Sequence, residues 1–259
     1  MRMNGTVAML HHFPIKGLSA QPLDAVTLAP GEGFPFDRAF GFARHDSGFD
    51  PADPRPLPKD RFFVLLRDEK LARLNTAFDP ETRQLTVRVA GETVLDEDLS
   101  TPAGIAAMES LLSGMFDLPP EQRPVFAHAA PHRFTDVSVT SAQMMNAISL
   151  INLASVAELG AKSGQTVDPM RFRANVYFDG WAPFAELDLV GREVSIGAAR
   201  LRIVKRTRRC AATEVDPVTA ARDIRVPHLL KQHFGHVDMG VYAEVLAPGR
   251  IAPGDAISL

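Results

Sequence analysis

The chain has 259 residues, 46% of them hydrophobic and 23% charged, the ordinary balance of a globular protein of one large or two small domains. Lys and Arg number 28 against 31 Asp and Glu, and the net charge of −3 argues against a surface that binds nucleic acid throughout. The single cysteine, Cys210, excludes an intramolecular disulfide, a zinc site with two or more of the chain's own thiolates, and an iron–sulfur cluster held by four of them.

The sequence offers no targeting or membrane segment. The apolar stretch before His11 is about four residues long, which is too short for a signal peptide. No run approaches the ~20 apolar residues that a membrane helix needs. A lone reduced cysteine is usual in the cytoplasm, so we expect a cytoplasmic protein without a membrane span.

Short strands with turns between them dominate the first half of the chain. Residues 26–28 form a short apolar segment before a Pro-Gly turn. Residues 85–89 alternate in polarity, and residues 90–92 turn them towards 93–95, which predicts a hairpin. Residues 49–58 contain four prolines and therefore predict an extended surface loop.

Three helices are predicted. The first begins after Thr101, an N-cap followed by proline, and is stopped by the prolines at 119–120. The second begins near Asn152 and ends at Gly160 or Gly164, and the third covers 227–234. The proline-dense segment 118–124 divides the chain into predicted domains 1–120 and 121–259.

The second half again contains short strands, predicted at 194–196, 201–204, 240–246 and 256–259. Strands this short, with this many Gly and Pro residues between them, favour a barrel or sandwich over a parallel α/β sheet. The predicted fold class is therefore mainly β with a few helices (α+β).

Cys210 lies at the end of a strongly basic segment. Six of the eleven residues 200–210 are Lys or Arg. Positive charge nearby stabilises a thiolate, the form that attacks an electrophile or binds a metal. The alternative is an unreactive cysteine that packs as a small core residue.

Two further groups of residues carry candidate anion-binding side chains. If 171–176 is a strand, Arg171, Arg173 and Asn175 share one face and form an anion cradle, the alternative being a solvated face with Arg–carboxylate pairs. Lys16 and Arg38 lie in or after Gly- and Pro-containing turns, the alternative being ordinary turns. Adjacent histidines at 11 and 12 would face opposite sides of a strand, so they predict no metal site.

Together these segments resemble the MOSC family, named for the C-terminal domain of molybdenum-cofactor sulfurases. In the C-terminal half the resemblance rests on RFRAN (171–175), PFAE (183–186), VG (190–191), IG (196–197), RCAAT (209–213), VDP (215–217), GVYA (240–243) and GRIAPGD (249–255). In the N-terminal half it rests on FPIK (13–16), Gly33 and Asp37-Arg38. Gly17 departs from the family, which often has Ser there.

The resemblance implies a β-barrel-rich MOSC domain, preceded by a smaller β-barrel-like N-terminal domain, with a molybdenum-cofactor site between them. It implies that Cys210 ligates molybdenum or carries sulfur. It also implies that the pterin and its phosphate are held by Lys16, Arg38, Arg173 and Asn175, with Ser155 near the cofactor.

The leading hypothesis is a molybdenum-cofactor-binding oxidoreductase that reduces N-oxygenated small molecules. Its electrons would come from an external iron–sulfur or flavin protein, since the chain has no thiolates for a cluster. The alternative is a sulfur carrier or cofactor-handling protein with a persulfide on Cys210 and an external pyridoxal-phosphate desulfurase as sulfur donor. A third possibility is a binding domain without activity.

Overall fold

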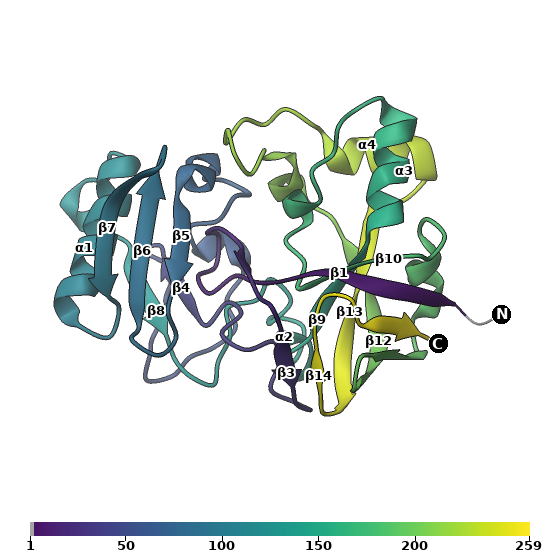
Figure 1. Cartoon of the computed structure of the whole chain (residues 1–259). Helices are drawn as coiled ribbons and strands as arrows, with labels where there is room; N and C mark the ends of the chain where they lie inside the picture. Colours follow the sequence, from purple (N-terminus) through teal and green to yellow (C-terminus); the bar gives the residue numbers. More distant parts are fainter. Residues whose placement is uncertain (1–2) are drawn as a thin grey trace.

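A closed β-barrel of seven strands forms one half of the computed structural model, which describes residues 3–259 (Figure 1). Around the barrel the strands follow the order β10 (Val176–Asp179), β9 (Ile148–Asn152), β13 (Asp238–Ala247), β12 (Ala199–Arg208), β11 (Glu193–Ile196), β15 (Ala256–Ser258) and β1 (Asn4–His12). Strand β1 closes the barrel by pairing with β10, with Val7 opposite Phe178. Strands β9 and β10 are parallel, while their neighbours pair in antiparallel fashion.

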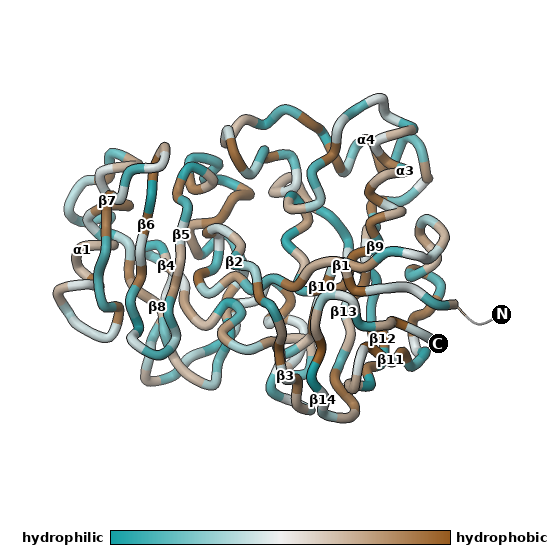
Figure 2. Tube along the Cα trace, in the orientation of Figure 1, coloured by the Kyte–Doolittle hydropathy of each residue, from teal (hydrophilic) through white to brown (hydrophobic). Residues whose placement is uncertain are grey.

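Two short ladders extend the barrel. Strand β2 (Gln21–Pro22) pairs with the end of β1, and β3 (Val26–Leu28) pairs with β14 (Gly249–Ile251). The barrel is filled by alternate side chains of its strands, such as Leu201 and Ile203 of β12. Hydrophobic and hydrophilic residues therefore follow each other at short intervals along the strands (Figure 2).

Helices α3 (Leu153–Ser163) and α4 (Val226–Phe234) pack together beside the barrel (Figure 1). The Asn152 side chain caps α3 by accepting from the amide of Ala154, and Gly164 ends the helix in the left-handed conformation. Gly235 ends α4 in the same way. The predictions of both helices are confirmed.

The smaller part of the molecule contains two further sheets and a helix (Figure 1). These are the sheet of β5 (Asn75–Phe78), β6 (Gln84–Val89) and β7 (Glu92–Asp98), the ladder of β4 (Phe40–Ala43) with β8 (Val125–His128), and α1 (Pro102–Met115). The β6–β7 hairpin turns at Ala90 and Gly91, as the sequence predicts. Thr101 caps α1, which buries Met108 and Leu112 against the sheets.

The predicted boundary near residue 120 does not coincide with the division between the sheets. Strands β1 and β3 from the first thirty residues belong to the barrel side, whereas β8, beyond residue 120, pairs with β4. A proline-rich segment marks a break in local structure, but it carries no signal of which strands pair across the chain. The fold class is confirmed: the chain is mainly β, with a short helix α2 (Ala142–Met145) as the fourth helix.

No helix within residues 3–259 is long and apolar enough to cross a bilayer.

Candidate functional site

A pocket of about 350 Å³ is lined by residues of both parts of the molecule. Within residues 3–259, the acidic side chains that line it are Asp37 and Asp136. Its cationic side chains are Lys16, Arg38, Lys59, Arg171, Arg173, Lys205, Arg206, Arg208 and Arg209. A chain with a small negative net charge thus concentrates positive charge in one concave site, which favours an anionic ligand.

Cys210 lies in this pocket, directly after β12 and before a 3-10 helix over Ala211–Glu214. Its side chain is partly exposed, and Nζ of Lys59 donates to its Sγ across 3.1 Å. Lys59 begins the 3-10 helix Lys59–Arg61, which directly follows the proline-rich loop at 49–58. Sequence reasoning missed Lys59, because a lysine 151 positions before the cysteine carries no local signal of the contact.

Asp136 connects Lys59 to the buried Lys16. The Lys16 ammonium contacts Oδ1 of Asp136 and donates to the carbonyl of Phe134 at 2.8 Å, while Nζ of Lys59 lies 3.7 Å from Oδ2. Burial raises the pKa of Asp136, but Lys16 and Lys59 outweigh it and hold that pKa well below its usual range. Burial lowers the pKa of Lys59, but Asp136 and then Cys210 outweigh it, so the net direction is upward.

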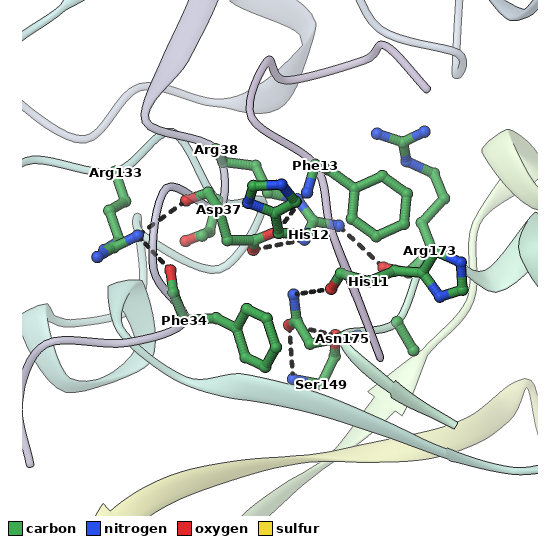
Figure 3. Close-up of polar contacts among 12 residues, drawn as sticks. His11, His12, Phe13, Phe34, Asp37, Arg38, Arg133, Ser149, Arg173 and Asn175 are labelled. Carbon is green, nitrogen blue, oxygen red and sulfur yellow. Dashed lines mark hydrogen bonds and ion pairs between the residues drawn. The ribbon is translucent and has the colours of Figure 1, made fainter. Parts of the chain in front are cut away.

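Arg38 and Arg173 lie against one aromatic ring. Their guanidinium carbons are 4.2 and 4.3 Å from the centre of the Phe13 ring (Figure 3). Arg38 pairs with Asp37 and donates to the backbone carbonyl of Arg173 at 2.9 Å. The guanidinium of Arg173 has no hydrogen-bond partner among residues 3–259. Burial, and then the charge of Arg38, lower the pKa of Arg173, which stays charged at neutral pH.

The prediction of a strand at 171–176 is wrong. Arg171 belongs to a 3-10 helix over Pro169–Phe172, which Asp168 caps by accepting from the amide of Met170. Arg173 follows in the left-handed conformation, with φ of 53°, and the strand begins only at Val176. The Asp-Pro pair starts a helical turn there, so Arg171, Arg173 and Asn175 do not share a strand face.

Arg171 and Asn175 line the pocket, but protein groups already bind both terminal nitrogens of Arg171 and the side-chain amide of Asn175. Arg171 is buried and pairs with Asp216 at 2.9 Å and Asp223 at 2.8 Å. Asn175 accepts from the Ser149 hydroxyl at 2.9 Å and donates to the backbone carbonyl of His11 at 3.3 Å (Figure 3). For Arg171 the carboxylate pairing of the alternative is present, but the side chain is buried and not on a solvated strand face. Asn175 forms hydrogen bonds with both β1 and β9.

The structure does not bring Ser155 to the pocket. Its buried hydroxyl donates to Oε1 of Glu186 at 3.0 Å and accepts from the amide of Phe184 at 2.8 Å. Burial raises the pKa of Glu186, although hydrogen bonds to the carboxylate act in the opposite direction. Ser155 thus satisfies a buried acid, a partner that the sequence does not reveal.

Three buried polar atoms of pocket-lining residues have no hydrogen-bond partner within residues 3–259. They are Oγ1 of Thr207, Nη2 of Arg209 and Nε of Arg171. The other donors of Arg209 bond to the carbonyls of Met239 and Phe172, each at 2.8 Å. An unpaired buried donor is costly, at about 1–3 kcal/mol, so these atoms are suited to bind a ligand. Thr207 and Arg209 carried no sequence signal beyond the basic composition around Cys210, whereas Arg171 was a candidate from the sequence.

Comparison with known proteins identifies a family that matches the second half of this chain. The model of the MOSC domain matches residues 131–258. The mouse mitochondrial amidoxime-reducing component 1 is 25% identical over 285 residues, which cover 98% of this chain and 82% of that protein.

Solved structures of low sequence identity are also similar. The YuaD protein of Bacillus subtilis aligns over 100% of this chain and 96% of its own, with 15% identity and a TM-score of 0.45. YiiM of Geobacillus stearothermophilus aligns over 43% of this chain and 53% of its own, with 19% identity and a TM-score of 0.34.

Proposed function

Because the chain is a MOSC-domain protein, distantly related to the amidoxime-reducing component, we propose that it binds the molybdenum cofactor and reduces N-oxygenated small molecules. The observation that carries the proposal is the cationic pocket with a single thiol, Cys210, beside an ammonium. The relative's printed name, an amidoxime-reducing component, supplies the class of substrate.

The residues of the pocket fit this cofactor. A molybdopterin brings two dithiolene sulfurs, so the protein needs to supply only one soft ligand, which is Cys210. Its phosphate needs cationic donors, and the Arg173 guanidinium and Nη2 of Arg209 are unpaired among the described residues. Arg38 adds positive charge beside Arg173, and Lys16 adds positive charge beside Asp136. A phosphate dianion would also offset the repulsion between Arg38 and Arg173, which lie against the same ring.

The chain's own residues would orient this chemistry. Lys59 holds the sulfur of Cys210 by a hydrogen bond, and Asp136 holds Lys59. The cofactor would supply the two-electron redox step. In the overall reaction, R–NHOH takes up two electrons and two protons, and R–NH₂ and water leave. The electrons would come from an external iron–sulfur or flavin protein.

A sulfur carrier is the second candidate, and the same contact supports it. The Lys59 ammonium at 3.1 Å would also stabilise a persulfide anion on Cys210. In that reaction an external desulfurase persulfide would transfer its outer sulfur to the Cys210 thiolate and leave as a thiol.

Molybdenum and pterin analysis tests the proposal. The wild type and Cys210→Ser are purified from a host that makes the cofactor. We expect stoichiometric molybdenum in the wild type, and loss of molybdenum or of reductase activity in the variant. Absence of molybdenum together with a cyanolysable sulfur on Cys210 would instead support the carrier. Absence of both would contradict both candidates.

A further inference from the structure

The end of β12 brings a second group of donors into the pocket. Lys205, Thr207 and Arg208 all line it, and they precede Cys210 by five residues or fewer. The pairing of β12 with β13 shifts between Ile203 and Lys205 and again between Arg206 and Arg208. Such bulges interrupt the alternation of a strand and redirect its side chains. The first shift places an extra residue in β12 and the second places one in β13, so both irregularities lie where Lys205, Thr207 and Arg208 line the pocket.

Lys205 and Arg208 are exposed cations without an ion-pair partner. Among residues 3–259, no carboxylate oxygen lies within 4.0 Å of either side chain. Asp238 is opposite Arg208 in the ladder, but it forms no ion pair with it. By contrast, Arg206 between them is tied to Asp188 at 2.9 Å and to a backbone carbonyl at 2.7 Å.

The acidic side chains of the pocket are engaged elsewhere. Asp37 pairs with Arg38, and Asp136 pairs with Lys16 and Lys59. The charge of Lys205 and Arg208 is therefore not neutralised within the pocket. Of the donors fitted to the cofactor phosphate above, Arg173, Arg38 and Lys16 come from other segments of the chain, and Arg209 adjoins Arg208; neither Lys205 nor Arg208 is among them.

Thr207 gives an independent indication of a ligand. Thr207 lines the pocket, its side chain is 3% exposed, and its hydroxyl has no hydrogen-bond partner in the described part of the chain. Buried hydroxyls nearly always have a partner, so this one is suited to donate to a bound acceptor. A hydroxyl and two unpaired cations that line the same pocket are the groups that bind an anion.

We propose that Lys205, Thr207 and Arg208 bind an anionic group of the substrate. The substrates of this pocket are then N-oxygenated small molecules that carry a carboxylate, phosphate or sulfonate. The N-oxygenated part of this statement rests on the proposed function, whereas the anion subsite does not. The subsite lies beside Cys210, so the group that it binds fixes the substrate next to the thiol.

Paired probes test the subsite: benzamidoxime, which is uncharged, and 4-carboxybenzamidoxime, which carries one carboxylate. Calorimetry gives the Kd of each for the protein purified from a cofactor-making host. We expect the carboxylate to bind about tenfold more tightly, since two partly exposed charges are worth about one decade. The preference should fall as salt rises. Thr207→Val, which keeps the shape but lacks the hydroxyl, should reduce the preference about threefold.

Removal of the two charges should remove the preference. We expect nearly equal Kd values for both probes in Lys205→Met/Arg208→Met. The matched control is Arg200→Met/Arg202→Met, which removes two exposed cations of the same strand outside the pocket and should keep the preference. Equal Kd values in the wild type would overturn the proposal, and so would a preference that survives in Lys205→Met/Arg208→Met.

Reduction of the probes is measured separately, with reduced viologen or with an acidic redox protein as donor. If Lys205→Met/Arg208→Met slows only the protein donor and keeps the probe preference, the cations dock a partner and the proposal is wrong. If neither probe is reduced and molybdenum is absent, but the preference still depends on Lys205 and Arg208, the anion subsite stands and the proposed function fails.

Discussion

Nζ of Lys59 lies 3.1 Å from Sγ of Cys210, although 151 positions separate the two residues in the chain. The contact joins the end of a proline-rich loop in the smaller part of the molecule to the end of a barrel strand. It gives the only thiol of the sequence an ammonium neighbour, and Asp136 holds that ammonium from the other side.

This contact predicts how fast Cys210 reacts. In Lys59→Met the thiolate loses its cation, so we expect alkylation by iodoacetamide at pH 7 to slow about tenfold. Lys59→Arg keeps a cation and should react nearly as fast as the wild type. Because the chain has one cysteine, the mass of the intact protein reports this residue alone. Arg61→Met, an exposed cation of the same 3-10 helix, is the control, and equal slowing in it would contradict the prediction.

Asp136→Asn should destabilise the protein at neutral pH, because the ammonium of the buried Lys16 then loses its carboxylate partner. Asp136 is half-exposed to the pocket, so we expect a loss of about 2 kcal/mol in the free energy of unfolding, below the range for fully buried pairs. Urea denaturation of wild type and variant at pH 7 measures it.

The pH dependence of that loss follows from the pKa of Asp136, which lies below its usual value in the folded state. Its stabilising effect is therefore present above the unfolded pKa of about 3.9 and disappears as the pH falls through the folded pKa. The difference in stability between wild type and Asp136→Asn should shrink below about pH 4. A difference that stays constant from pH 7 to pH 3 would rule out this ion pair as its source.

Arg173 and Arg171 should differ when each is replaced by methionine. Arg173 has no protein partner for its guanidinium and lies beside another cation, so Arg173→Met should lower the molybdenum content with little change in stability. Arg171 is buried between Asp216 and Asp223, so Arg171→Met should cost about 3–5 kcal/mol. Thermal unfolding and metal analysis of both variants test the contrast, which fails if Arg173→Met keeps a full complement of molybdenum.

Ser155→Ala should affect stability and not the cofactor. The substitution removes a donor to the buried carboxyl of Glu186 and an acceptor for the amide of Phe184, at a cost of about 1–3 kcal/mol. Molybdenum content per folded molecule should equal that of the wild type. Normal stability with a lowered molybdenum content would show instead that Ser155 serves the site.

Local signals allowed much of the fold to be predicted. Thr101-Pro102, Asn152 and Gly235 mark helix ends through capping chemistry that acts within four residues, and the β6–β7 hairpin follows from its two-residue turn. The closure of the barrel by β1 and β10 was not predictable in this way, because the pairing depends on residues more than 160 positions apart.

The same distinction between local signals and long-range contacts explains which residues of the candidate site could be predicted. Cys210, Lys16, Arg38 and Arg173 stand in segments with a recognisable pattern, and the structure brings all four to one pocket. The contact of Lys59 with Cys210 and the unpartnered hydroxyl of Thr207 arise only from the packing of distant segments. For Arg171 the residue type was informative, but the carboxylates that occupy it lie 45 and 52 positions away.

Strand β1 has a consequence for the order of biosynthesis. Its Asn4 pairs with Ser258 and its Leu10 with Val176, and the same segment continues directly to Phe13 and Lys16 of the pocket. During translation, residues 6–10 therefore lack their β10 partners until residues 176–179 have been made, and residues 4–6 lack their β15 partners until residues 256–258 have been made. Long-range pairing of this kind slows folding. Tyr242, the last residue that lines the pocket, is made near the end of synthesis, so the pocket forms only once most of the chain is complete. Loss of the last strand would leave Asn4–Thr6 of β1 without their β15 partners, at the far end of the chain.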